Sequence, residues 1–202
     1  MKINTIRVFH YLCKNGHLED AQHILEIHPT INISAKNEEA FRMACRYGHL
    51  VVAQWLYQIK PIINISAYNE GAFRNACENG HLEVAQWLYE IKPISSSNTS
   101  WAFCWTCANG HLEVAQWLYQ IKPTLDTEFA FGFTCEFGHL HVAQWLYKIK
   151  PTLDISADDE YAFRCACKNA HLQVAQWIQS LDPNKYVILH VGKKIKFRII
   201  TH

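Results

Sequence analysis

The sequence predicts an all-α fold, a helical solenoid of six helix-turn-helix repeats with short finger loops and a C-terminal β-hairpin cap. Three observations predict it. A Gly-His-Leu triplet occurs five times and a sixth copy reads Ala-His-Leu, so six copies fill nearly all of the 202 residues. Within each copy the apolar residues recur at helical spacing. After residue 184 the apolar period changes to two, which is typical of strands.

Each repeat carries the same residues around its triplet. A Cys lies three residues before the triplet and a Phe, here called the common Phe, lies seven before it. The common Phe residues are Phe9, Phe41, Phe73, Phe103, Phe131 and Phe163. Successive triplets are spaced by 32, 32, 30, 28 and 32 residues. The two shorter spacings come from deletions in the connection between one repeat and the next.

The first helix of a repeat is best seen in the third copy. Its apolar residues lie one or four positions apart and share one helix face: Ala72, Phe73, Ala76 and Cys77. Asn69 is expected to cap this helix and Gly80 to end it. Before the helix, segments such as Ile63-Asn64-Ile65-Ser66 alternate apolar and polar residues, which predicts a short extended finger.

The second helix is apolar around most of its circumference. Between Leu82 and Lys92 its polar residues, Glu83, Gln86 and Glu90, form one narrow stripe. A helix pair of this length is not stable alone, so neighbouring repeats must cover it. A Pro follows each second helix and is expected to stop it, as Pro93 does here.

These patterns divide the chain into a repeat domain over 1–183 and a hairpin cap over 184–202. The repeats are expected at about 4–29, 36–61, 68–93, 98–123, 126–151 and 158–183. In the first repeat His23 occupies the usual Trp position, which suits an exposed end of the stack. In the cap, residues alternate on both sides of Gly192-Lys193, so its apolar face is expected to close the last helix pair while Lys and Arg face water.

The repeated sequence pattern resembles the ankyrin repeat, whose second half commonly reads G-H-L-E-V-V. The resemblance covers about residues 5 to 182 and is most specific in G-H-L-E-V-A-Q-W-L-Y. The first half departs from the family's T-P-L-H, because Glu39-Ala40-Phe41-Arg42 keeps only the large apolar residue. This variant is similar to ankyrin proteins of giant amoeba viruses. The resemblance implies a protein that binds partner proteins through its fingers and the concave face built by its first helices.

Composition narrows the function further. The formal net charge is +1, so no bulk field attracts nucleic acid or anionic lipid. The N-terminus lacks a signal-peptide core and no segment approaches membrane-spanning length, which favours a soluble intracellular protein, in the host cytoplasm if viral. No nucleotide-binding, nucleophile-elbow or HExxH motif occurs, so no enzyme activity, metal or cofactor is expected.

Cysteine and histidine admit two interpretations. Cys-x-x-Gly-His offers two metal ligands a repeat, whereas a zinc site needs four converging groups. A buried Cys and a His that bonds in the turn between the helices are therefore favoured. Cys104-x-x-Cys107 and Cys165-x-Cys167 are close pairs, but neither has the context of a redox or metal motif.

An excess of aromatic residues in the fourth and fifth repeats is the remaining lead. Trp101, Phe129 and Tyr161 lie two residues before a common Phe, and Trp105 and Phe133 lie two after one. Phe137 and Tyr47 precede the turn Gly. The candidate partner-binding residues are Trp101, Trp105, Phe129, Phe133, Phe137 and Tyr47. Alternatively, rings at 101 and 129 fill the space of the shortened fingers.

A possible basic strip, Arg42, Arg46 and Arg74, is better explained as a solvated face. The leading functional hypothesis is a monomeric scaffold that binds a partner protein on the concave and finger face. The alternative is an adaptor that recruits its target to a larger assembly such as ubiquitin-ligase machinery, as viral ankyrin proteins with a recruitment domain do. That role would need the hairpin or the first repeat to dock.

Overall fold

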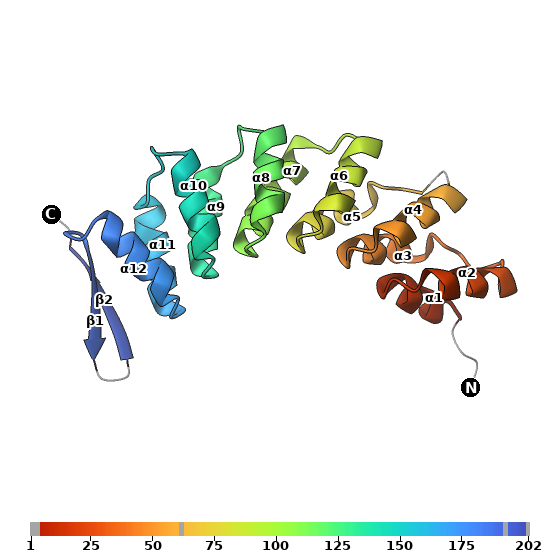
Figure 1. The fold of residues 1–202 in the computed structure, drawn as a ribbon, viewed down its shortest axis with the longest axis horizontal. Coiled ribbons are helices and arrows are strands. Elements are labelled where there is room, and N and C mark those ends of the chain that lie inside the picture. Colours follow the sequence, from red (N-terminus) through yellow and green to blue (C-terminus); the bar gives the residue numbers. More distant parts are fainter. Residues whose placement is uncertain (1–4, 61–62, 192–193, 201–202) are drawn as a thin grey trace. The chain divides into compact units, whose positions relative to one another are not determined.

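The computed structural model describes residues 5–60, 63–191 and 194–200. In these ranges the chain forms twelve α-helices, arranged as six pairs, and one antiparallel β-hairpin (Figure 1). The predicted fold class is therefore confirmed. The chain divides into two compact units, Met1–Ala102 and Phe103–His202. The predicted division at residue 183 stays a prediction.

The helix bounds follow the repeats. Unit 1 contains α1 (Thr5–Lys14), α2 (Leu18–Ile27), α3 (Ala35–Arg46), α4 (Leu50–Ile59), α5 (Ala67–Glu78), α6 (Leu82–Ile91) and the start of α7 (Ser96–Ala108). Unit 2 contains the rest of α7, α8 (Leu112–Ile121), α9 (Thr127–Glu136), α10 (Leu140–Ile149), α11 (Ala157–Lys168), α12 (Leu172–Leu181), β1 (Tyr186–Val191) and β2 (Lys194–Ile199). Each second helix ends two residues before its Pro, although Pro61 itself lies outside the described residues.

Aromatic contacts join successive repeats within each unit. All six common Phe side chains are buried. In unit 1 the ring of Trp87 lies 6.1 Å from that of Phe41 and 5.8 Å from that of Tyr57, both in the preceding repeat. In unit 2 Trp177 contacts Phe131 in the same way, at 6.1 Å. Each repeat therefore covers apolar surface that its neighbour cannot bury alone.

The recurring Gly-His pair is explained by packing between repeats. Gly48 has φ +78°, a conformation in which a side chain is strained, and a Cβ there would lie 2.5 Å from Nδ1 of His81 in the next repeat. The same approach joins Gly138 to His171. The sixth copy has Ala170 at this place, still at φ +60°. Helix α12 and the hairpin follow Ala170, and not a further repeat with a Gly-His-Leu triplet.

The entry to three first helices differs from the prediction. Residues 36–38, 68–70 and 158–160 all have positive φ and form a left-handed turn before the right-handed helix. Asn69 lies inside this turn and is not the helix cap. The preceding fingers are turns and not extended segments, because the side chain of Asn64 accepts a hydrogen bond from the Ser66 amide at 3.1 Å.

The last residue of each left-handed turn anchors the next connection. The carboxylate of Glu70 accepts hydrogen bonds from the Ser95 amide at 3.1 Å and from Asn98 Nδ2 at 2.9 Å. Glu160 pairs with Lys185 at 2.6 Å and accepts a hydrogen bond from the Tyr186 hydroxyl. These bonds hold the turns in a conformation that is costly for residues with a Cβ.

Helix α9 begins without a left-handed turn. Its connection is shortened, and the side chain of Asp126 caps the helix by accepting hydrogen bonds from the amides of Glu128 and Phe129, at 3.1 and 3.0 Å. The deletion thus replaces a turn and its anchoring carboxylate with an ordinary N-cap.

The hairpin pairs Tyr186 with Ile199 at one end and Val191 with Lys194 at the other. Tyr186 is buried, with its ring 4.5 Å from that of Phe163, and Phe197 lies 5.8 Å from the same ring. The apolar face therefore covers the last helix pair, as predicted. Arg198 is exposed, whereas the predicted turn Gly192-Lys193 lies outside the described residues.

Candidate functional site

Four of the predicted partner-binding residues meet in unit 2. The ring of Trp105, on α7, lies 6.0 Å from Phe133 and 6.5 Å from Phe137. Phe129 packs edge-on against Phe133 at 4.8 Å. Tyr161, on α11, adds a fifth ring, 6.1 Å from Phe133. We call these five residues the aromatic cluster.

Two rings of the cluster, both in the fifth repeat, are much more exposed to solvent than the common Phe of that repeat. Phe129 is 51% exposed and Phe137 is 45% exposed, while the common Phe131 on the same helix is 2% exposed. Trp105 and Phe133 are half-buried. Phe129 therefore leaves half of its surface outside the packing, which the space-filling alternative did not expect.

Trp101 and Tyr47, the other two predicted residues, each have a cation over the ring. In unit 1 the guanidinium carbon of Arg74 lies 4.4 Å from the centroid of Trp101, which is 37% exposed. The ammonium of Lys14 lies 4.9 Å from the centroid of Tyr47. Both rings are thus already partly occupied within the chain.

The three arginines of the basic strip, Arg42, Arg46 and Arg74, have different surroundings. Arg42 stacks on Tyr68 at 4.3 Å and donates hydrogen bonds to the carbonyl oxygens of Asn37 and Lys36, at 2.9 and 3.2 Å. Describing it as a solvated face was wrong for Arg42, as for Arg74, because both guanidinium groups are used in packing. Arg46 is exposed.

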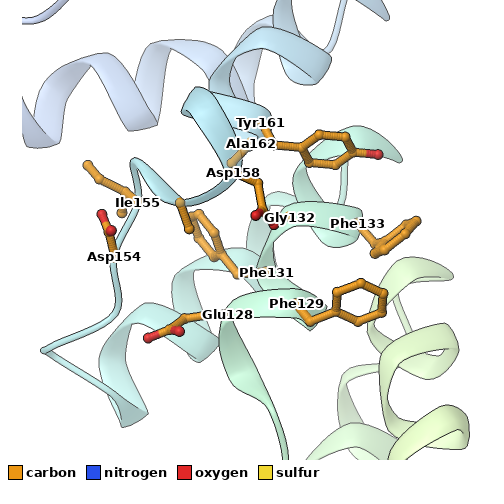
Figure 2. A pocket seen from close by; sticks show the side chains of 11 residues that line it. Glu128, Phe129, Phe131, Gly132, Phe133, Asp154, Ile155, Asp158, Tyr161 and Ala162 are labelled. Atoms are coloured by element: carbon orange, nitrogen blue, oxygen red, sulfur yellow. The ribbon is translucent and has the colours of Figure 1, made fainter.

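A pocket of about 150 Å³ opens beside the cluster, between α9 and the start of α11 (Figure 2). The rings of Phe129, Phe131, Phe133 and Tyr161 line it. Three carboxylates, from Glu128, Asp154 and Asp158, also line it. Sequence reasoning missed this pocket. The signal that points to it is Gly132, at the place where the second, third and sixth repeats have Arg.

The three carboxylates differ in how they are used. Glu128 pairs with Lys150 at 3.0 Å, and Asp154 accepts a hydrogen bond from the Ser156 amide at 2.8 Å. The Asp158 side chain forms no hydrogen bond or ion pair with any other residue in the described part of the chain. Figure 2 shows its carboxylate pointing towards Gly132.

Tyr161 is held in position by a hydrogen bond. Its hydroxyl donates to Oε2 of Glu136 at 2.5 Å. This bond, together with burial, raises the pKa of Tyr161. The bond also holds in place a ring that lines the pocket.

Burial disfavours the thiolate form of several cysteines. Burial raises the pKa of Cys13 to about 12 and those of Cys104 and Cys167 to about 11. A thiol whose pKa is raised is a poor nucleophile and a poor metal ligand. In the described residues no three His, Cys, Asp or Glu side chains are placed to hold a metal ion.

The recurring histidines pack against the preceding turn. Burial lowers the pKa of His81 and of His139, which also lie close to other histidines. The favoured interpretation of Cys and His as packing residues agrees with these positions.

Among the described residues no helix is both long and apolar enough to cross a membrane.

Comparison with known proteins agrees with the repeat pattern. A search of the curated proteins finds no match. Residues 9–99 match a family model described as ankyrin repeats (3 copies). This stretch of the chain is therefore similar to ankyrin repeats, which are generally modules for protein–protein interaction.

Proposed function

We propose that the protein is an interaction scaffold that holds a partner protein on its concave and finger face, with the aromatic cluster at the centre of the contact. The observation that carries the proposal is the exposure of Phe129 and Phe137, at 51% and 45%, within a repeat that buries its common Phe. Large aromatic side chains in partly closed pockets are typical energetic centres of protein interfaces.

The cluster also has the rigidity that a binding surface needs. Its rings contact one another, and Tyr161 is fixed by Glu136. Few side-chain rotations are then lost when a partner binds. Trp101 and Tyr47 are proposed as secondary contacts, because their cations must share the ring with a partner.

Affinity capture from cell lysate, followed by binding measurements with the purified captured protein, tests this proposal. The double variant Trp105→Ala/Phe133→Ala should weaken binding by more than tenfold, as expected for two interface anchors. A matched control removes two exposed apolar side chains from unit 1, Tyr11→Ala/Ile27→Ala. Circular dichroism must show that both variants keep their helices. Equal binding by both variants would refute the role of the cluster.

The alternative remains an adaptor that brings its target to an assembly such as ubiquitin-ligase machinery. It predicts a second captured protein that is retained by the Trp105→Ala/Phe133→Ala variant and is lost when the hairpin is altered. The proposal also includes a monomeric protein inside the cell, in the host cytoplasm if the chain is viral. The giant-virus source is likewise proposed, on the resemblance of the repeat sequence.

A further inference from the structure

Two sequence positions face each other across the junctions between repeats. One is the residue directly after a common Phe, and the other lies two residues before the next common Phe. In unit 1 they are His10 and Glu39, whose side chains lie 3.0 Å apart, Arg42 and Gly71, and Arg74 and Trp101, which stack at 4.4 Å. Arg74 therefore stacks on the ring at the second position, whereas Arg42 faces a glycine there and stacks instead on Tyr68 at 4.3 Å.

The junction between α9 and α11 has lost its basic side chain. Its two positions hold Gly132 and Tyr161, and a Cβ on Gly132 would lie 3.2 Å from Cδ1 of Tyr161. Tyr161 corresponds to Trp101, and Gly132 corresponds to Arg74. The pocket therefore opens where the chain itself elsewhere places a guanidinium group against a ring.

We infer that this pocket binds an arginine side chain of the partner protein. The inference rests on the proposed function and names the chemistry that the aromatic cluster recognises. The incoming guanidinium would stack on the pocket rings, as that of Arg74 does on Trp101.

Charge complementarity supports a cationic occupant. No residue that lines the described pocket is basic, and three are acidic. The Glu128 carboxylate already has Lys150, whereas that of Asp158 has no partner among the described residues. Asp158 points towards Gly132, where the missing guanidinium would lie (Figure 2).

Size and shape favour one arginine side chain over other cations. The volume of about 150 Å³ is below the roughly 300–1,000 Å³ of pockets that enclose whole small ligands. A guanidinium is planar, so it stacks on rings and still donates two parallel hydrogen bonds to a carboxylate. An ammonium group cannot do both with the same geometry.

The test uses the whole protein and a defined probe, N-acetyl-arginine amide, followed by aromatic ¹H–¹³C NMR. Saturable shifts are expected at Phe129, Phe133 and Tyr161. N-acetyl-citrulline amide has nearly the same shape without the charge, and it should bind at least about tenfold more weakly, as should the lysine analogue.

Two variants locate the site without removing any ring of the cluster. Gly132→Arg supplies the guanidinium from within the chain and should abolish probe binding. Asp158→Asn removes one charge at nearly constant shape and should weaken binding about tenfold. Asp20→Asn, on exposed α2 surface in unit 1, is the matched control.

Each outcome bears on the inference. Arginine-selective shifts that are lost in Gly132→Arg and weakened in Asp158→Asn support it. The inference is wrong if the arginine probe causes no saturable shifts. It is also wrong if the citrulline probe binds as tightly as the arginine probe, or if the Asp158→Asn variant binds the arginine probe as tightly as the Asp20→Asn variant does. If the captured partner still depends on Trp105 and Phe133 while the arginine probe fails, the proposed scaffold stands and only the arginine chemistry falls.

Discussion

Two junctions between repeats use the same two sequence positions with opposite results. In unit 1 the positions hold Arg74 and Trp101, and in unit 2 they hold Gly132 and Tyr161. The first is closed by a cation over an aromatic ring, and the second leaves a pocket lined by rings and carboxylates. The repeat framework is the same in both. The two junctions differ in the residue after the common Phe, because Arg74 fills its junction with a guanidinium group and Gly132 leaves that space without a side chain.

The largest effect is expected where the two units are alike. Trp87→Ala removes the ring that contacts Phe41 and Tyr57, and Trp177→Ala removes its counterpart in unit 2. Each should destabilise its unit by about 3 kcal/mol, because a large contact between repeats becomes a cavity. Urea unfolding followed by circular dichroism measures this. A loss below about 1 kcal/mol in either variant would show that the rings do not join the repeats.

The next effect concerns the turn that both units share. Gly48→Ala should cost about 2 to 3 kcal/mol, because alanine is strained at φ +78° and its methyl group meets His81. Ala170→Gly should be neutral or stabilising, since only the strain at φ +60° is relieved. Urea midpoints of the two variants test this. Equal and opposite shifts would mean that the backbone conformation, and not the histidine, accounts for the repeated glycine.

A smaller effect separates the closed junction from the open one. Arg74→Ala removes a partly exposed cation–π contact in unit 1 and should cost about 0.5 to 1 kcal/mol. Arg46→Ala, which changes an exposed arginine of the same unit, is the control. Differential thermal unfolding compares the two variants. If they are equally stable, the stacking of Arg74 on Trp101 contributes nothing and the comparison of junctions loses its energetic basis.

The smallest change in stability at neutral pH is expected from the histidines, whose contribution appears as the pH falls. His81 and His139 have pKa values below their ordinary 6.5 in the folded chain, chiefly because of burial. Below pH 6.5 the unfolded chain takes up protons before the folded one, so stability falls as pH falls towards the folded pKa values. Above that window these groups contribute no slope.

Melting temperatures between about pH 7 and 5 test this effect, since histidine titrates in that range. The double variant His81→Gln/His139→Gln should show a flatter profile than the wild type, with His28→Gln as the control for loss of an imidazole. Parallel profiles for the wild type and the double variant would contradict the assignment.

Much of the fold could be predicted because its signals are local. Phe, Cys and Gly at constant spacing mark the first helices, and a Pro marks the end of each second helix. Four of six candidate binding residues lie together, because positions two before and two after a common Phe share a helix face. In unit 1, Arg74 and Lys14 lie over the rings of the other two, Trp101 and Tyr47.

The sequence by itself determined the six repeats, their helices, the C-terminal hairpin and the concentration of aromatic residues in the shortened repeats. Only the tertiary structure decided that residues 68–70 turn left-handed, because hydrogen bonds from Ser95 and Asn98 to Glu70 offset a conformation that local preference disfavours. It also decided that Gly132 faces Tyr161 and that Asp158 lines the space beside them. These residues belong to different repeats and meet only when the helix pairs stack, so no local pattern reports their contact.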